Sequence, residues 1–313
     1  DVRGNESGSF KGGEDDIIVE NGSEIKLSID IKLQRYIEKL LEGKTGSVVA
    51  IDPSSGELLA IASAPSFDPN ILSGRDYSKN YRNLQLDTLK PIYNRALTAT
   101  YPPGSMFKLI QALIGLEENV VSKEDQIYVD LSRIGDLAPA GIYDLNKAIV
   151  NSSNNYFHML FRKLINQKRD NNTFIDSRIG LDRWSEYVKK FGLGSDLDFD
   201  ISNMSSGFVP SSEYYDGFYG KGRWKFSNIY SLSIGQGELL VTPIQMANFA
   251  SIIANRGYYY NPNIVTHING KKISNNQRKY LNIDKTHFDY VVDAMENVVM
   301  NGSARRAYMR ELM

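Results

Sequence analysis

The first regular pattern of apolar residues begins after Asp30 and ends at Gly43. Within it, apolar residues recur at the i, i+3, i+4, i+7 and i+8 positions that form one face of an α-helix. These residues are Leu33, Tyr36, Ile37, Leu40 and Leu41. The pattern predicts an amphipathic helix with Asp30 as its N-cap. Residues 1–25, in contrast, are rich in glycine and charge without a sustained period, which predicts a linker.

Two short apolar runs follow this helix, at 47–52 and 57–63, and a Pro-Ser-Ser-Gly turn at 53–56 separates them. Nearly continuous apolar residues are typical of strands inside a sheet, so we predict a β-hairpin. A single hairpin is only marginally stable, so other segments must complete its sheet.

Helical periods dominate the middle of the chain. They follow a turn-rich stretch from about 65 to 104, and they occur at 105–118, about 144–167 and 182–191. The aromatic and glycine-rich segment 214–224 lacks such a period, so we predict a loop there.

Two further helices are predicted towards the C-terminal end. Thr242 as N-cap and Pro243 as first helical residue begin one that ends at Gly257. The other stops at Asn301, and its apolar face consists of Phe288, Val291, Val292, Met295, Val298 and Val299. No clear strand pattern follows residue 265. The chain as a whole therefore predicts a mixed α/β (α+β) fold with an N-terminal hairpin and a helical body.

Composition excludes several classes of function. The chain has 36 Lys and Arg against 37 Asp and Glu, so it lacks the basic surface expected of a protein that binds nucleic acid. The absence of cysteine excludes a thiol nucleophile and every cysteine-containing metal site. The histidines, His158, His267 and His287, lack metal-ligand spacing, so no metal site is predicted. No run approaches the roughly 18 apolar residues of a membrane-spanning helix.

The segment 101–108, Tyr-Pro-Pro-Gly-Ser-Met-Phe-Lys, carries the clearest chemical signal. Its prolines and glycine lead into a helix that begins at about Ser105, and the i, i+3 spacing places Lys108 over Ser105. A serine hydroxyl is a poor nucleophile unless a base takes its proton, and a lysine is a base only when its amine is neutral. Burial and the positive N-terminus of a helix both favour the neutral amine. We therefore predict that Ser105 is a nucleophile and Lys108 its general base.

A second polar element lies at 151–155, Asn-Ser-Ser-Asn-Asn, between apolar flanks. Polar side chains in such a place need hydrogen-bond partners. One interpretation makes Ser152 a proton shuttle and Asn154 the residue that holds a substrate amide. The shifted frame, Ser153 with Asn155, fits the same spacing, and helix capping by either serine is the structural alternative.

The same two spacings occur at other positions. Ser-x-x-Lys at Ser23–Lys26 lies in a linker-like stretch, and the Ser-x-Asn segments that begin at Ser78 and Ser274 lie in polar, turn-like stretches. We expect all three to be solvated.

Taken in order, these segments resemble the penicillin-binding D,D-transpeptidases, and most closely the class B, elongation-type group known as penicillin-binding protein 2. The motifs that carry the resemblance are Tyr-Pro-Pro-Gly-Ser-Met-Phe-Lys at 101–108, Ser-Ser-Asn-Asn-Tyr-Phe at 152–157, Ser-Ile-Gly-Gln-Gly-Glu-Leu-Leu-Val-Thr-Pro at 233–243, Gly-Ser-Val-Val-Ala-Ile-Asp-Pro-Ser-Ser-Gly-Glu at 46–57, Ala-Pro-Ser-Phe-Asp-Pro-Asn at 64–70, Tyr-Asn-Arg-Ala at 93–96 and Asp-Val-Arg-Gly at 1–4. The resemblance covers nearly the whole chain.

The resemblance implies a fold and a set of site residues. The fold would be an antiparallel sheet flanked by helices, beside an all-helical lobe, with the cleft between them. The C-terminal strands that complete the sheet would be missing from this chain. Ser105 would be the acylated nucleophile and Lys108 its base, with Ser152 and Asn154 as the second motif. The loop Gly235-Gln236-Gly237 would lie near the cleft and bind substrate.

The resemblance also implies a reaction and its partners. The enzyme would crosslink peptidoglycan stem peptides through an acyl-enzyme, and β-lactam antibiotics would react covalently with the same serine. It would work without a cofactor, beside a glycan-polymerising membrane partner of the elongation machinery. It would be held at the bacterial inner membrane by an anchor outside this chain, with the catalytic domain in the periplasm.

The chain departs from the family pattern at the third motif, Lys-Thr-Gly or Lys-Ser-Gly, which should lie on a strand C-terminal to the other two. Lys44-Thr45-Gly46 has these letters but precedes Ser105 and falls in a predicted turn. The expected position follows Ala307, and the chain ends at Met313. We therefore expect 1–25 to be the end of an N-terminal non-catalytic region, and 26–313 a transpeptidase domain that stops before this motif.

Two alternatives stay open. A D,D-carboxypeptidase or β-lactamase would share the fold and the acyl-enzyme, although no convincing glutamate for positioning a hydrolytic water lies near the motifs. A catalytically incomplete scaffold for a glycan polymerase would keep the fold without the third motif.

Overall fold

The computed structural model describes residues 21–273 and 277–308. Residues 1–20 of the predicted linker and Ser274 lie outside the described residues. In chain order the elements are β1 (Ile25–Leu27), α1 (Ile31–Leu41), β2 (Gly46–Ile51), β3 (Leu58–Ala64), α2 (Tyr77–Leu86), α3 (Lys108–Glu117), β4 (Ile127–Val129), β5 (Gly141–Tyr143), α4 (Leu145–Val150), α5 (Asn154–Ile165), α6 (Thr173–Lys190), α7 (Ser212–Tyr219), α8 (Phe226–Ile229), α9 (Pro243–Ala254), β6 (Tyr258–Tyr259), β7 (Val265–Ile268), β8 (Lys271–Lys272), β9 (Lys279–Tyr280) and α10 (Lys285–Met300). Short 3₁₀ helices lie at Pro69–Leu72, Gly104–Phe107, Tyr230–Ile234 and Arg305–Ala307.

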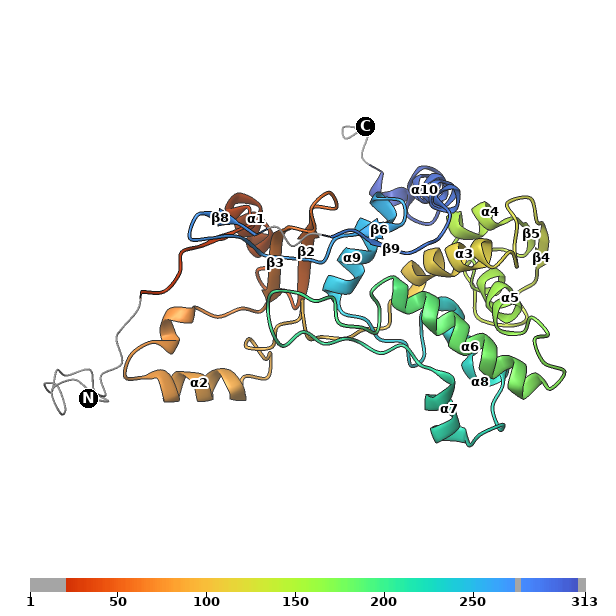
Figure 1. The fold of residues 1–313 in the computed structure, drawn as a ribbon, viewed down its shortest axis with the longest axis horizontal. Helices are drawn as coiled ribbons and strands as arrows, with labels where there is room; N and C mark the ends of the chain where they lie inside the picture. The colour runs from red at the N-terminus through yellow and green to blue at the C-terminus, as the bar shows by residue number, and fades with distance from the viewer. Residues whose placement is uncertain (1–20, 274–276, 309–313) are drawn as a thin grey trace, which may run out of the picture.

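The molecule is elongated, with a hairpin at one side and a helical lobe at the other (Figure 1). The hairpin of β2 and β3 lies next to α1, the lobe contains α3 to α6 and α10, and α9 lies between them. The described strands pair as one three-stranded sheet, β1-β7-β8, and as the pairs β2-β3, β4-β5 and β6-β9. The described residues therefore form a mixed α/β fold with many helices and small antiparallel sheets.

The predicted hairpin and the helix before it are confirmed. Strands β2 and β3 are antiparallel, with Val49 opposite Ile61. The Asp30 carboxylate caps α1 by accepting the backbone N–H groups of Lys32 and Leu33 at 2.8 and 3.1 Å. One face of α1 then covers alternate residues of β3, as an amphipathic helix must.

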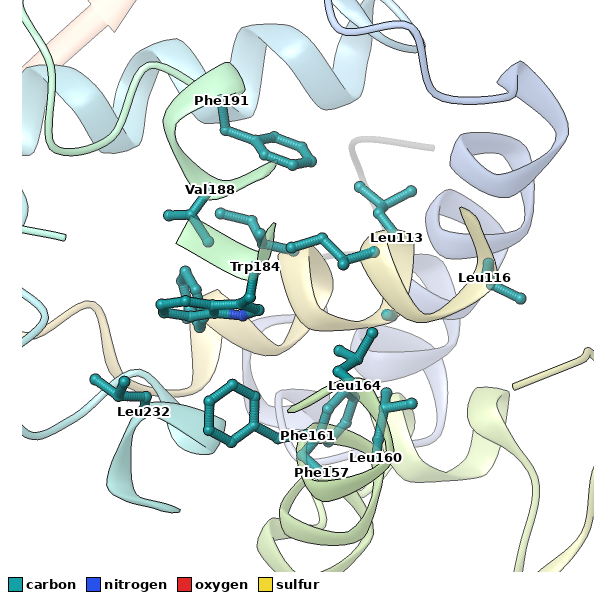
Figure 2. Packing of buried hydrophobic residues seen from close by; sticks show 14 of the residues in the cluster. Leu113, Leu116, Phe157, Leu160, Phe161, Leu164, Trp184, Val188, Phe191 and Leu232 are labelled. Atoms are coloured by element: carbon teal, nitrogen blue, oxygen red, sulfur yellow. The ribbon is translucent and has the colours of Figure 1, made fainter. Parts of the chain in front are cut away.

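The main core lies in the helical lobe, around α3 (Figure 2). Helix α3 is buried on nearly every side, because α4, α5, α6 and α10 all pack against it. Leu113 and Leu116 of α3 belong to the same buried cluster as Leu160 of α5 and Val188 of α6 (Figure 2). Trp184 of α6 packs its ring edge-to-face against Phe161 of α5, with ring centroids 5.4 Å apart. This packing fixes the helix that carries Lys108.

The helical stretch predicted at about 144–167 is two helices. Helix α4 ends at Val150 and α5 begins at Asn154, so the predicted second motif occupies the break. Ser152 lies in the left-handed region, with φ of +52°, which a continuous α-helix does not allow. The helix predicted at 182–191 is longer, because Asn172 caps it at the N-terminus and its first turns pack on α5.

Two helices lie where we predicted turns or a loop. Helix α2 lies in the stretch 65–104 and has no buried residue, so its sequence lacks the apolar stripe that would reveal it. Helix α7 lies within and just before 214–224: Ser211 caps it, and Gly220, with φ of +91°, ends it. The glycines of this segment led to the prediction of a loop, but the eight residues before Gly220 form a helix.

The strands β1 and β7 were also missed. Residues Ile25–Leu27 were divided between the predicted linker and the domain, but they pair antiparallel with β7, which follows residue 264. Their side chains are exposed and the pairing spans some 240 residues, so no local period marks it. The helices predicted from Thr242 and before Asn301 are confirmed as α9 and α10.

Among the helices in 21–273 and 277–308, none combines the length and apolar composition needed to cross a bilayer.

Candidate active site

Ser105 lies in the 3₁₀ turn Gly104–Phe107, immediately before α3. Its side chain is exposed, and its Oγ makes no hydrogen bond within the described part of the chain. The turn is held from one side by backbone pairing: the Tyr101 and Val241 N–H groups each donate to the carbonyl of the other residue at 2.9 Å. Ser105 is therefore an accessible hydroxyl on a fixed backbone.

Lys108 is the first residue of α3 and is buried, with 2% of its surface exposed. Its Nζ lies 2.6 Å from the Ser152 carbonyl oxygen, 2.6 Å from Asn154 Oδ1 and 3.0 Å from Ser152 Oγ. Burial lowers the pKa of Lys108 from 10.5 to about 8, against the opposing effect of the nearby Asp136 carboxylate. With this pKa, roughly a tenth of the amine is neutral at pH 7 and about half at pH 8.

The three contacts of the Lys108 amine also fit its neutral form. A neutral amine has two N–H groups and one lone pair. The Ser152 carbonyl and Asn154 Oδ1 only accept, so they take the two N–H groups. The Ser152 hydroxyl can then donate to the lone pair over 3.0 Å. The arrangement can therefore hold a basic nitrogen and exchange a proton with Ser152.

The direct contact between Ser105 and Lys108 that the i, i+3 spacing predicts is absent from the described structure. The Lys108 amine points to residues 152–154, because two amide oxygens and a hydroxyl there satisfy more of its hydrogen bonds than one exposed hydroxyl could. A bond between nucleophile and base often tightens only in the substrate complex. The two groups nevertheless remain one helical turn apart in sequence.

The structure distinguishes the two overlapping Ser-x-Asn frames by their contacts. Ser152 and Asn154 contact Lys108. Ser153 and Asn155 are buried and face the other way: Ser153 caps α5 through the Tyr156 N–H at 3.3 Å, and Asn155 binds the backbone at 133–134. The capping alternative thus describes Ser153, whereas the frame Ser152 and Asn154 faces the amine.

Asp136 is the residue that the sequence analysis missed. Its Oδ2 accepts the Ser153 hydroxyl at 2.9 Å and the Asn155 backbone N–H at 2.8 Å. Burial raises the pKa of Asp136, but hydrogen bonds from the backbone N–H groups of Asn155 and Ala138 outweigh it and leave the pKa below its usual value. Asp136 lies in a loop without a period and bonds to residues 17 and 19 positions away, so no local signal could have revealed it.

The loop Gly235-Gln236-Gly237 lies against the turn that carries Ser105. The Gly104 N–H donates to the Gly235 carbonyl at 2.9 Å. Gly235 has φ of +69°, and a Cβ there would lie 2.4 Å from the Gly104 oxygen and 2.7 Å from Phe107 Cβ. Only glycine allows this close approach. Gln236 and Gly237 are exposed beside it.

The other segments with similar letters lie away from these contacts. Lys44 and Thr45 lie between α1 and β2, and Gly46 is the first residue of β2; Lys44 donates to the Leu40 carbonyl. Ser78 lies in α2, and Ser23 precedes β1. Within 21–273 and 277–308, no three His, Asp or Glu side chains are placed to hold a metal ion.

Comparison with known proteins identifies the family. Residues 46–310 match the model of the penicillin-binding protein transpeptidase domain. The chain is 31% identical over 303 residues to the peptidoglycan D,D-transpeptidase MrdA of Acinetobacter baumannii, covering 91% of this chain and 42% of that protein. It is also 31% identical over 304 residues to MrdA of Haemophilus influenzae, covering 92% of this chain and 44% of that protein. The chain thus spans less than half the length of these relatives.

Solved structures show the same relationship. The crystal structure of Pseudomonas aeruginosa PBP2 in complex with WCK 5153 superposes with a TM-score of 0.78 at 32% identity, covering 91% of this chain and 64% of that one. PBP2 of Helicobacter pylori, solved in a complex with MreC, superposes with a TM-score of 0.73 at 25% identity, covering 91% of this chain and 50% of that one. The chain therefore belongs to the penicillin-binding protein transpeptidase family, among relatives that are MrdA and PBP2 peptidoglycan D,D-transpeptidases.

Proposed function

We propose that this protein is a serine D,D-transpeptidase that crosslinks peptidoglycan stem peptides through an acyl-enzyme on Ser105. The observation that carries the proposal is the Lys108 amine: it is buried, has a pKa of about 8, and is held by Ser152 and Asn154 one turn from an exposed serine. A partly neutral amine in this position is the base that a serine nucleophile requires.

In the first half-reaction, Ser105 Oγ attacks the carbonyl carbon of the penultimate D-Ala of a stem pentapeptide. The Ser105 proton passes to the neutral Lys108 amine. The bond between the carbonyl carbon and the nitrogen of the terminal D-Ala then breaks, and Ser152, 3.0 Å from Lys108 Nζ, relays a proton to that nitrogen. Free D-Ala leaves, and an ester on Ser105 remains.

In the second half-reaction, the amine of a neighbouring stem peptide attacks the ester carbonyl. A new amide bond forms, the bond to Ser105 Oγ breaks, and the proton lost by the amine returns to Oγ through Ser152 and Lys108. Two easier steps thus replace one difficult one. Asn154 keeps the Lys108 amine in place through its Oδ1, and it also holds the substrate amide.

The relatives support the proposed setting. The H. pylori PBP2 structure is a complex with MreC, and another relative at 25% identity belongs to a structure described as coordinating polymerization and crosslinking in a peptidoglycan synthase complex. We accordingly propose a glycan-polymerising membrane partner and a periplasmic catalytic domain for this protein.

The test gives the full-length protein a stem peptide that ends in D-Ala-D-Ala together with an acceptor amine, and identifies the products by mass. We expect D-Ala release and a new amide product, both lost in the Ser105→Ala variant. Release of D-Ala with only the free acid as the other product would instead identify a carboxypeptidase. Rapid turnover of nitrocefin would identify a β-lactamase, and no release at all would favour a scaffold.

A further inference from the structure

The segment that contacts Lys108 is held from behind by a second set of hydrogen bonds. Asp136 Oδ2 accepts the Ser153 hydroxyl at 2.9 Å, the Asn155 backbone N–H at 2.8 Å and Asn155 Nδ2 at 3.2 Å. Its Oδ1 accepts the Ala138 N–H at 3.0 Å. Ser153 and Asn155 are almost completely buried, at 0% and 1% exposure, so few other partners can replace this carboxylate.

Asp136 also lies at the N-terminus of α5. Helix α5 begins at Asn154, and the Asn155 N–H that Asp136 accepts belongs to its first turn. The N–H groups of a first helical turn have no partner within the helix, and they carry a partial positive charge. An ionised carboxylate there stabilises the beginning of α5, and with it the position of Asn154.

The bonds to Asp136 alternate along the chain with the bonds to Lys108. Asn154 lies between the two residues that Asp136 holds; its Nδ2 donates to the Gly135 carbonyl at 2.6 Å, and its Oδ1 accepts from Lys108 at 2.6 Å. Ser152, which presents both its carbonyl and its hydroxyl to Lys108, has φ of +52°. A non-glycine residue keeps this conformation only when its surroundings hold it there.

We propose that Asp136 is a positioning residue: its carboxylate holds Ser153 and Asn155 so that Ser152 and Asn154 stay against the Lys108 amine. The inference rests on the proposed function, because it assigns Asp136 a role in acylation of Ser105. Within the described residues Asp136 makes no hydrogen bond or ion pair with Lys108, so it positions the partners of the amine and does not hold the amine itself.

The charge of Asp136 gives the proposal a distinctive signature. Burial and Asp136 are the two influences on the pKa of Lys108, and they act in opposite directions. Replacing Asp136 by Asn removes the influence that raises this pKa, so the pKa falls below about 8. This charge effect moves the pH profile, whereas loss of positioning lowers the rate at every pH, so the two effects can be measured separately.

The experiment compares Asp136→Asn with a control at Asp130 in the full-length protein. Asp130 lies in the same loop, but it is exposed and accepts only from Ser132 in its own turn. The second-order rate of Ser105 acylation by a fluorescent penicillin is measured across pH, and unfolding by urea is measured in parallel.

We expect Asp136→Asn to slow acylation by about 10- to 100-fold, the scale of small displacements of catalytic groups, and to move the rising part of the pH profile to lower pH. Asp130→Asn should match the wild type in both. An unchanged rate and profile in Asp136→Asn would overturn the inference. A profile that moves while the plateau rate stays at the wild-type value would show that Asp136 acts only through its charge, and it would also overturn the inference.

If Asp136→Asn does not fold, Ser153→Ala provides the second test. It removes one hydrogen bond of the carboxylate and the cap bond from the Tyr156 N–H, and it leaves the bonds from Asn155 and Ala138 to Asp136 in place. We expect slower acylation in a folded Ser153→Ala protein, and a wild-type rate would overturn the inference. A wild-type protein that forms no adduct would contradict the proposed function itself, separately from any effect at Asp136.

Discussion

The Nζ atom of Lys108 lies 2.6 Å from Oδ1 of Asn154, a contact that joins residues 46 positions apart. It connects the first turn of α3 with the first residue of α5. The Lys108 amine is buried, and it can donate to Asn154 Oδ1 whether it is protonated or neutral. The contact therefore holds the amine in either state. The proposed base and the second motif are therefore held together as one unit.

The rate of acylation should depend on the protonation of Lys108. Only the neutral amine accepts a proton, so the rate should rise with pH and level off above the Lys108 pKa of about 8. Lys108→Arg should lose about 10²- to 10⁴-fold in rate, because a guanidinium stays protonated. Stopped-flow acylation between about pH 6 and about pH 10 covers this pKa and measures both effects. A wild-type rate that is flat across this range would contradict the prediction.

The neighbouring asparagines should have different effects when replaced. Asn155→Ala leaves the backbone N–H groups of Arg133 and Ile134 without their acceptor and should cost about 1–3 kcal/mol in the free energy of unfolding. Asn154→Ala removes a half-buried side chain at the amine and should slow acylation by about tenfold or more at nearly unchanged stability. Urea unfolding and acylation of both variants test this; equal loss of stability in the two would argue against the assignment of the frames.

Gly235→Ala should impair acylation through the backbone. Its Cβ would lie 2.4 Å from the Gly104 oxygen, so the turn that carries Ser105 must move. Gly43 is the matched control, because it has the same φ of +69° but a Cβ there would meet no atom within 4 Å. Gly43→Ala should lose about 1–2 kcal/mol for an alanine in the left-handed conformation. Gly235→Ala should lose more because of the clash, and only Gly235→Ala should slow acylation. Equal acylation rates in the two variants would show that Gly235 does not position the turn.

Gln111 should contribute to stability through two buried hydrogen bonds. Its Oε1 accepts Trp184 Nε1–H at 2.9 Å, and its Nε2 donates to the Leu232 carbonyl at 3.2 Å. Gln111→Leu leaves the indole N–H unpaired and should cost about 1–3 kcal/mol in the free energy of unfolding. The same change at the exposed Gln126 is the control and should cost less than about 0.5 kcal/mol. Similar losses at the two positions would contradict the prediction.

Local sequence patterns predicted those helices and strands whose signal lies in neighbouring residues. The Asp30 cap, the hairpin at 47–63 and the helix that begins at Pro243 depend on neighbouring residues, and all three are present. Helix α2 has no buried face, and β1 pairs with a strand some 240 residues away, so neither left a period in the sequence.

In the candidate site, too, the features that depend on neighbouring residues were predicted and those that depend on distant contacts were not. Ser105 and Lys108 are close in sequence and follow a Pro-Pro-Gly turn, which made the pair visible. The two Ser-x-Asn frames have identical spacing, and only contacts with Lys108 and Asp136 distinguish them. The direct contact between Ser105 and Lys108 could not be judged from spacing, because the long lysine side chain turns towards residues 152–154.

The most direct test of the central claim is the mass of the full-length protein after treatment with a penicillin, followed by mapping of the modified peptide. We predict one penicilloyl group on the peptide that contains Ser105, and none in the Ser105→Ala protein. An adduct that persists in Ser105→Ala, or that maps to another serine, would contradict the assignment of Ser105 as the nucleophile.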